Sequence, residues 1–223
     1  MFWNASAIKG YHIAATDGEV GHVADILFDE GSWTVRWLIV HTGSWLNQRA
    51  VCLPVWALAQ PDPEAHDLAV TLTRRQIESS PEIDDDARLS LEREAIISAY
   101  YATVLSCPVG IEPPHHLVSL SVLKDATVET TDGEIGHVES LLVDTRTWTV
   151  KYLVVHTGQW WADKKVLLLP GTVDRIDDVR SSIDLNVSRE KVRGSPDYVA
   201  GETVDGAFDE QFQIYYGVKW MRK

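Results

Sequence analysis

Cysteine, methionine and long apolar runs are all scarce in this chain of 223 residues. It has two cysteines and two methionines, and neither Cys52 nor Cys107 has a His or Cys at metal-ligand spacing. This excludes a disulfide scaffold and predicts two reduced thiols. Apolar runs such as residues 166–169 have the length of a strand, whereas a membrane helix needs roughly 20 residues. Because the first residues also lack the pattern of a secretory signal, we expect a cytoplasmic protein without membrane insertion.

Basic side chains are also in short supply. Lys and Arg number 20 against 33 Asp and Glu, which gives a formal net charge of −13. Neutralising a phosphate backbone needs clustered Lys and Arg, so we expect no direct binding to nucleic acid. The chain contains no Gly-x-Ser-x-Gly elbow, phosphate-binding loop or dinucleotide fingerprint. The sequence therefore assigns no catalytic residue and no cofactor.

An internal repeat organises the whole chain. Residues 16–43 recur as residues 131–158 at an offset of 115, without a gap, and 17 of the 28 positions are identical. A unit of this length is a domain rather than a solenoid repeat. Residues 107–114 contain three prolines and read as a short stiff linker. We therefore predict a first domain over residues 1–106, a linker over 107–116 and a second domain over 117–223.

Each repeat carries the pattern of short strands followed by a helix. Asp17-Gly18 and Asp132-Gly133 predict tight hairpin turns, and in the first repeat strands are expected over residues 20–28, 33–41, 51–58 and 68–72. Residues 73–76 have the spacing of a capping box for a single helical turn. Helical spacing of apolar residues from about Leu91, and again over 208–216, predicts amphipathic helices. The expected fold class is all-β, with two tandem small barrels, each followed by a short helix.

These residues resemble the PRC-barrel family. The resemblance is carried by the hairpins at residues 19–23 and 134–138, the Asp-x-x-x-Trp turns at 29–33 and 144–148, and the segments at 42–45, 49–54, 157–160 and 165–170. The family includes the cytoplasmic part of the photosynthetic reaction-centre H subunit and a ribosome-maturation factor. The best match is to tandem bacterial PRC-barrel proteins. The resemblance implies a barrel fold and offers no catalytic residues to carry over.

Paired histidines are the first candidate for chemistry. His22 is equivalent to His137, and His41 to His156, so a four-histidine metal or proton site is conceivable. Metal ligands must converge on one point, however, and duplication alone produces pairs without convergence. We therefore predict structural or exposed histidines and no metal. Carboxylates beside the two hairpin turns, Asp17 with Glu19 and Asp132 with Glu134, are explained by the turns themselves.

Tryptophans are the best candidates for an interface. The chain has nine, against four phenylalanines. Trp33, Trp37 and Trp148 are expected in the core or at a barrel rim. Trp45, Trp160 and Trp161 follow a Thr-Gly turn, where packing does not obviously need an aromatic side chain, and buried aromatics often anchor protein interfaces. The alternative, that these three seal the barrel ends or the two halves, carries equal weight.

The sequence thus favours a non-enzymatic interaction or scaffold protein. A protein partner or self-association is expected, because fusing two copies makes intramolecular what separate domains achieve by dimerisation. One alternative is an accessory factor in RNA processing or ribosome assembly that acts through protein contacts. A second alternative is a ligand- or metal-dependent enzyme.

Overall fold

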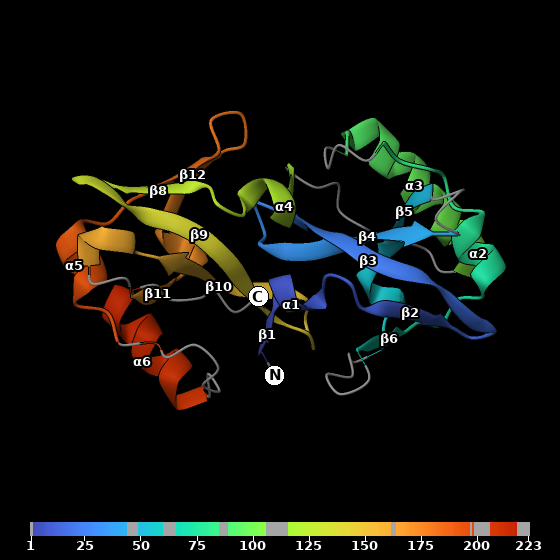
Figure 1. Ribbon diagram of the computed structural model, residues 1–223, viewed down its shortest axis with the longest axis horizontal. Coiled ribbons are helices and arrows are strands. Elements are labelled where there is room, and N and C mark those ends of the chain that lie inside the picture. The colour runs from blue at the N-terminus through green and yellow to red at the C-terminus, as the bar shows by residue number, and fades with distance from the viewer. Residues whose placement is uncertain are drawn as a thin grey trace. The chain divides into compact units, whose positions relative to one another are not determined.

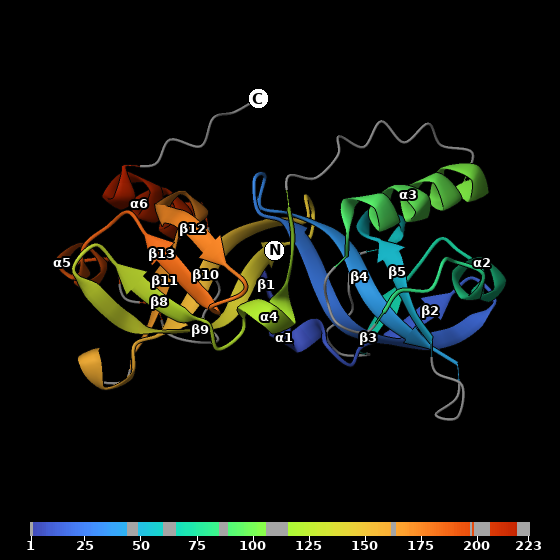
Figure 2. The same cartoon turned by 90° about the horizontal axis from the view of Figure 1, so that it is seen from above.

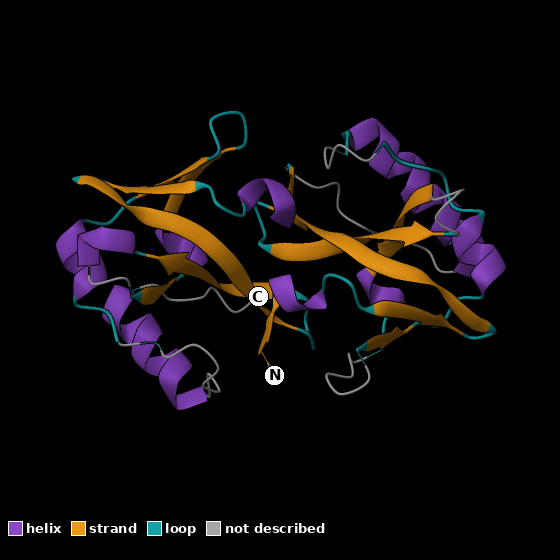
Figure 3. Ribbon diagram, in the orientation of Figure 1, coloured by secondary structure: helices purple, strands orange, loops and turns teal. Residues whose placement is uncertain are grey.

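The computed structural model describes residues 2–43, 49–59, 66–84, 89–105, 116–161, 164–196, 198 and 206–217. Strands predominate (Figure 3), as the strand-like sequence pattern predicts. The chain divides into two compact units. Unit 1 contains Ala5–Ser121 and Thr145–Thr149, and unit 2 contains Phe2–Asn4, Val122–Asp144 and Val150–Lys223. The predicted linker over 107–116 lies outside the described residues except for His116.

The sheet of unit 1 is built around two long central strands. The strands follow the order β6-β2-β3-β4-β5, and β7 pairs with the last residues of β3. Only β2 and β6 run parallel, and the other neighbouring pairs are antiparallel. Figure 1 shows β3 and β4 lying side by side along the unit. The strands are β2 (His12–Ala15), β3 (Gly18–Asp29), β4 (Thr34–Thr42), β5 (Arg49–Pro54), β6 (Asp67–Ala69) and β7 (Leu117–Ser119).

The sheet of unit 2 repeats this topology. Its order is β12-β13-β8-β9-β10-β11, and β1 pairs with the last residues of β9. The parallel pair is β13 with β8, the counterpart of β6 with β2. The strands are β1 (Phe2–Asn4), β8 (Thr127–Thr130), β9 (Gly133–Asp144), β10 (Thr149–His156), β11 (Lys165–Leu168), β12 (Val173–Asp177) and β13 (Ser182–Leu185).

The helices are short apart from the one that follows each sheet. No helix among the described residues is long and apolar enough to cross a membrane. The α-helices are α1 (Ala5–Ile8), α2 (Arg74–Glu78), α3 (Leu91–Leu105), α4 (Leu120–Leu123), α5 (Arg189–Arg193) and α6 (Gly206–Tyr216). Single 3-10 turns are η1 (Val55–Ala57), η2 (Gly158–Trp161) and η3 (Pro170–Thr172).

Local sequence signals explain where the elements begin and end. Gly18 and Gly133 have φ of +133° and +132°, a conformation that favours glycine in the predicted hairpin turns. Thr73 caps α2 in the predicted capping box with Gln76. The prediction of a strand over residues 51–58 is wrong for residues 55–58. The strand ends at Pro54, whose ring leaves no N–H for a ladder, and η1 follows.

The sheet of unit 1 buries apolar residues on both of its faces, and α3 packs against it. Trp37, Leu38, Ile39 and Val40 on β4 are all buried, so this strand is covered on both faces, as its composition predicts. Figure 2 shows α3 lying along β4 and β5. Tyr101 on α3 donates a hydrogen bond to the carbonyl oxygen of Cys52, at 2.8 Å. Burial raises the pKa of the Cys52 thiol far above its ordinary value, as expected of an inert reduced cysteine.

The helix that follows each sheet carries an acidic side chain that hydrogen-bonds to the sheet, at equivalent positions in the two units. In unit 1 the buried Glu94 accepts hydrogen bonds from Arg36 Nη2 at 2.7 Å and from Trp37 Nε1 at 3.3 Å. In unit 2 Asp209 accepts one from the hydroxyl of Tyr152 at 2.5 Å. Both acids and both aromatic residues are related by the offset of 115. The predicted amphipathic helices are therefore held by polar contacts as well as by apolar burial.

Candidate functional site

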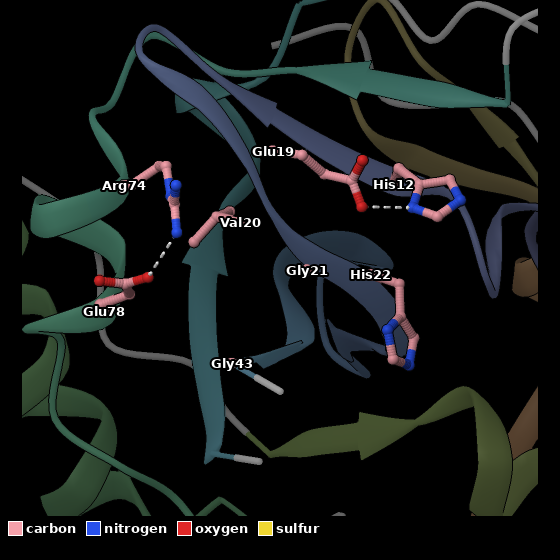
Figure 4. A pocket seen from close by; sticks show the side chains of 8 residues that line it. All are labelled: His12, Glu19, Val20, Gly21, His22, Gly43, Arg74 and Glu78. Atoms are coloured by element: carbon pink, nitrogen blue, oxygen red, sulfur yellow. Dashed lines mark hydrogen bonds and ion pairs between the residues drawn. The ribbon is translucent and has the colours of Figure 1, made fainter. Parts of the chain in front are cut away.

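A surface pocket in unit 1 is the best candidate for a functional site (Figure 4). Its volume is about 320 Å³. Two histidines, two glutamates and an arginine face it, together with backbone that contains two glycines. These lining residues come from β2, β3, the end of β4 and α2: His12, Glu19, Val20, Gly21, His22, Gly43, Arg74 and Glu78.

Strand pairing places three histidines side by side. His12 on β2 lies opposite His22 on β3, and His22 lies opposite His41 on β4. Directly opposed residues project from the same face of a sheet, so the three side chains form one row, which we call the histidine row. The rings of His22 and His41 meet edge to face with centroids 5.5 Å apart.

A glycine makes this close approach possible. Gly21 has φ of +157°, and a Cβ built on it would lie 2.0 Å from the carbonyl oxygen of His41. Any side chain there would force β3 and β4 apart. The glycine of the repeated Gly-His-Val motif is thus required by backbone contact, and it fixes His22 beside His41.

Two pairs of polar side chains border the pocket. His12 Nδ1 lies 2.9 Å from Glu19 Oε1, and Arg74 Nη2 lies 3.6 Å from Glu78 Oε1. In Figure 4 the two pairs lie on opposite sides of Val20. All four side chains are about half exposed or more, so each pair contributes only about 0–1 kcal/mol to stability. Such pairs can exchange their partners for groups on another molecule at little cost.

The carboxylates of the hairpin turns have a structural role. Asp17 Oδ1 accepts a hydrogen bond from the backbone N–H of Arg74 at 2.7 Å, and Asp132 Oδ1 accepts one from Arg189, also at 2.7 Å. This backbone hydrogen bond and a second one from the Thr130 hydroxyl lower the pKa of Asp132. Each aspartate therefore ties a hairpin to the start of the short helix α2 or α5, as the turn-based interpretation favours.

Unit 2 carries a changed version of the pocket residues. His137 and Arg189 stand where unit 1 has His22 and Arg74, but Thr127 stands opposite His137 in place of His12. Arg193 stands in place of Glu78. The guanidinium of Arg189 bonds instead to the carbonyl oxygen of Glu134, through Nη2 at 2.7 Å and Nε at 3.2 Å. The two units therefore share the backbone scaffold of the pocket but differ in the side chains around it.

The histidines singled out from the sequence are brought together as two pairs. His22 lies against His41 in unit 1, and His137 lies against His156 in unit 2 with ring centroids 5.1 Å apart. Within the described ranges, no group of three or more His, Cys, Asp or Glu side chains is arranged to hold a metal ion.

The predicted interface tryptophans are described only in part. Trp45 lies outside the described residues, and for Trp160 only the backbone, in η2, is described. Trp161 is half-buried, and the ammonium of Lys164 lies 4.9 Å from its ring centroid. The role of these three residues as an interface therefore stays a prediction.

Sequence reasoning missed His12, Arg74 and Glu78. They come from two segments outside the repeated 28 residues and meet His22 only through the pairing of β2 with β3 and the docking of α2. The sequence did contain one signal. At the positions of His12 and Glu78 the second copy has Thr127 and Arg193, which differ from them in charge or chemistry.

Comparison with known proteins identifies one family. Residues 115–192 match the family model of the PRC-barrel domain, so a PRC-barrel domain is present in the second repeat, as the motif resemblance predicts. No curated protein matches the chain.

Proposed function

We propose that this is a non-enzymatic interaction or scaffold protein of the cytoplasm, built from two PRC-type barrels in tandem. The PRC-barrel domain at residues 115–192 supports the second barrel. The first is supported by the internal repeat and by the matching strand order of unit 1. The partner is a protein, since the net charge of −13 disfavours direct contact with nucleic acid.

The observation that carries the proposal is the divergence of the pocket between the two units. The hairpin, the glycine and the short helix are the same in both units, while His12 and Glu78 occur only in unit 1. Exposed polar pairs such as His12–Glu19 and Arg74–Glu78 contribute little to folding. Their groups are therefore available to a partner segment that carries charges of both signs.

Affinity capture with the full chain tests this proposal. The bait carrying His22→Ala and Arg74→Ala is compared with the wild type and with a matched control carrying His137→Ala and Arg189→Ala in unit 2. We expect the first variant to lose a protein that the wild type and the control both retain. Equal loss from both variants, or no stoichiometric partner for the wild type, would contradict the proposal.

The identity of the captured protein separates the scaffold role from the accessory role. A ribosomal or RNA-processing protein lost with the unit 1 variant would make this chain an accessory factor that acts through protein contacts. Any other protein lost in the same way would leave the scaffold role as the function.

A further inference from the structure

The first strand of each repeat pairs within the unit of the other repeat. In unit 2, β1 lies antiparallel to the end of β9, with Phe2 opposite Asp144 and Asn4 opposite Leu142. In unit 1, β7 lies antiparallel to the end of β3, with Leu117 opposite Asp29 and Ser119 opposite Leu27. The two strands are related by the offset of 115, and so are their partners. The exchange is therefore reciprocal and has the same register in both units.

A buried carboxylate in unit 1 accepts two of its hydrogen bonds from the exchanged segment. Asp25 on β3 is only 5% exposed. Its Oδ2 accepts a hydrogen bond from the hydroxyl of Ser119, and its Oδ1 accepts one from the backbone N–H of Ser121 at 3.1 Å. A buried charge needs such partners, because leaving one without them costs several kcal/mol. Both of these donors belong to the second repeat. The first repeat supplies the backbone N–H of Ile26, which donates to Oδ1 at 2.8 Å, and Lys9 Nζ at 4.0 Å.

Further contacts hold the exchanged segment, residues 116–121, against residues of the first repeat. The carbonyl oxygen of His116 accepts a hydrogen bond from the backbone N–H of Glu30 at 3.0 Å, and the N–H of His116 donates to Asp29 Oδ1 at 3.4 Å. Lys9 Nζ donates to the Ser121 hydroxyl at 2.7 Å. Leu117, Val118 and Leu120 are all buried. Polar and apolar groups of residues 116–121 thus complete unit 1.

In unit 2 the equivalent contact with the exchanged strand is made by neutral side chains. Ser140 stands at the position of Asp25, and Asn4 stands at the position of Ser119. The Ser140 hydroxyl donates to Asn4 Oδ1 at 2.5 Å, and Ser140 is 1% exposed. The same pair of positions therefore bonds across the exchange in both units, with a charge in unit 1 and without one in unit 2.

We propose that β1 and β7 are docking strands exchanged within one chain, so that neither repeat completes its own sheet. The edge of β3 binds the first strand of the second repeat, and the edge of β9 binds the first strand of the first repeat. The exchange makes the two repeats fold as one thermodynamic unit. Their covalent connection favours the exchange within a chain over exchange between chains, because it raises the effective concentration of each strand at its edge.

Four cysteine pairs in the full chain test the exchange directly. In a Cys52→Ala and Cys107→Ser background, Leu27→Cys with Ser119→Cys and Leu142→Cys with Asn4→Cys join residues that lie opposite each other. Opposed residues of antiparallel strands have Cα atoms about 4.5–5.5 Å apart, within reach of a disulfide. The controls recombine the same positions: Leu27→Cys with Asn4→Cys, and Leu142→Cys with Ser119→Cys.

We expect disulfides in the two exchanged pairs, within single chains, and none in the two controls. Disulfides in the controls in place of the exchanged pairs would show that each repeat keeps its own strand and would overturn the proposal. Disulfide-linked dimers from the exchanged pairs would also overturn it, because the occupant of each edge would then be a second copy.

Hydrogen exchange measured by mass spectrometry supplies a test with milder variants. Ser119→Ala changes the second repeat but should raise backbone exchange at residues 25–29 of unit 1 by tenfold or more. Ser140→Ala, the matched control, should raise it at residues 2–4 and 140–144 of unit 2 and leave residues 25–29 unchanged. An effect of Ser119→Ala confined to unit 2 would contradict the exchange.

Discussion

The two units solve the same packing problems with different amounts of charge. Unit 1 buries Glu94 against Arg36 and places Asp25 under the docking strand β7, whereas the equivalent contacts of unit 2 are Asp209 with Tyr152 and Ser140 with Asn4. The backbone geometry is nearly constant between the copies. The two units therefore share their backbone but differ in the charge of these side chains. Unit 1, which has the candidate pocket, carries the additional charge.

The largest effect is expected where the two units are alike. Gly21→Ala and Gly136→Ala would each place a Cβ 2.0 Å from a carbonyl oxygen, of His41 and His156 respectively. Because backbone must move, we expect each variant to lose about 4 kcal/mol of unfolding free energy in urea titrations.

Gly10→Ala is the control for this pair. Gly10 has φ of +87° but nothing within 4 Å of its added Cβ, so only conformational strain of about 1–2 kcal/mol is expected. Equal losses at Gly10 and Gly21 would contradict the clash as the cause.

Removing the acid of the helix should affect the units unequally. Glu94→Ala leaves the guanidinium of Arg36, whose side chain is 14% exposed, without its carboxylate and should cost about 3 kcal/mol. Asp209→Ala removes the hydrogen bonds from the Tyr152 hydroxyl and the Gln213 amide but leaves no buried guanidinium behind, and it should cost about 1 kcal/mol. Chemical unfolding of both variants measures the difference.

A double variant separates the charge from the packing of the helix. Glu94→Leu with Arg36→Met replaces the buried pair by apolar side chains and should recover most of the stability that Glu94→Ala loses. A double variant as unstable as Glu94→Ala would indicate that the ion pair itself stabilises unit 1.

Alkaline pH should destabilise the chain, and tyrosines of unit 2 should contribute more of the loss than tyrosines of unit 1. Burial is the main cause that raises the pKa of Tyr101 in unit 1 and of Tyr152 and Tyr216 in unit 2, the last to about 12. A raised pKa means that the folded state holds the proton more tightly. The stabilisation is therefore complete below the ordinary value of 10 and is lost as the pH rises above it.

The expected loss is about 1.4 kcal/mol per pH unit for each such tyrosine between pH 10 and 12. Urea titrations of the full chain at rising pH measure it, and the double variant Tyr152→Phe with Tyr216→Phe should remove more of the pH dependence than Tyr101→Phe. Equal loss of pH dependence in Tyr101→Phe and in the double variant would refute the comparison.

The smallest effect is expected at the pocket. Glu78→Arg gives unit 1 the arginine that unit 2 has as Arg193, so Arg74 should leave its ion pair and bond to the carbonyl oxygen of Glu19, as Arg189 does to that of Glu134. The unfolding free energy should change by about 0.5 kcal/mol or less. A crystal structure of the variant with Arg74 unmoved would contradict this explanation of the divergence.

The sequence by itself determined the repeat, the hairpin turns, the capping box of α2 and the PRC-barrel resemblance. These depend on neighbours along the chain: Asp17-Gly18 supplies the positive φ of the turn, and Thr73 with Gln76 supplies the capping bonds. Periodicity also indicated α3, in which Ile97 and Tyr101 are buried, but Ile96 of the same pattern is exposed.

Only the tertiary structure decided which distant residues meet. The histidine row depends on the register of β2, β3 and β4, and a shift of one residue would turn each side chain to the other face. The repeat by itself does not predict the exchange of β1 and β7, since the two strands are equivalent and each edge could pair with either. Hydrogen bonds across the pairing, Ser119 with Asp25 and Ser140 with Asn4, distinguish the two arrangements, and they form only once the chain has folded.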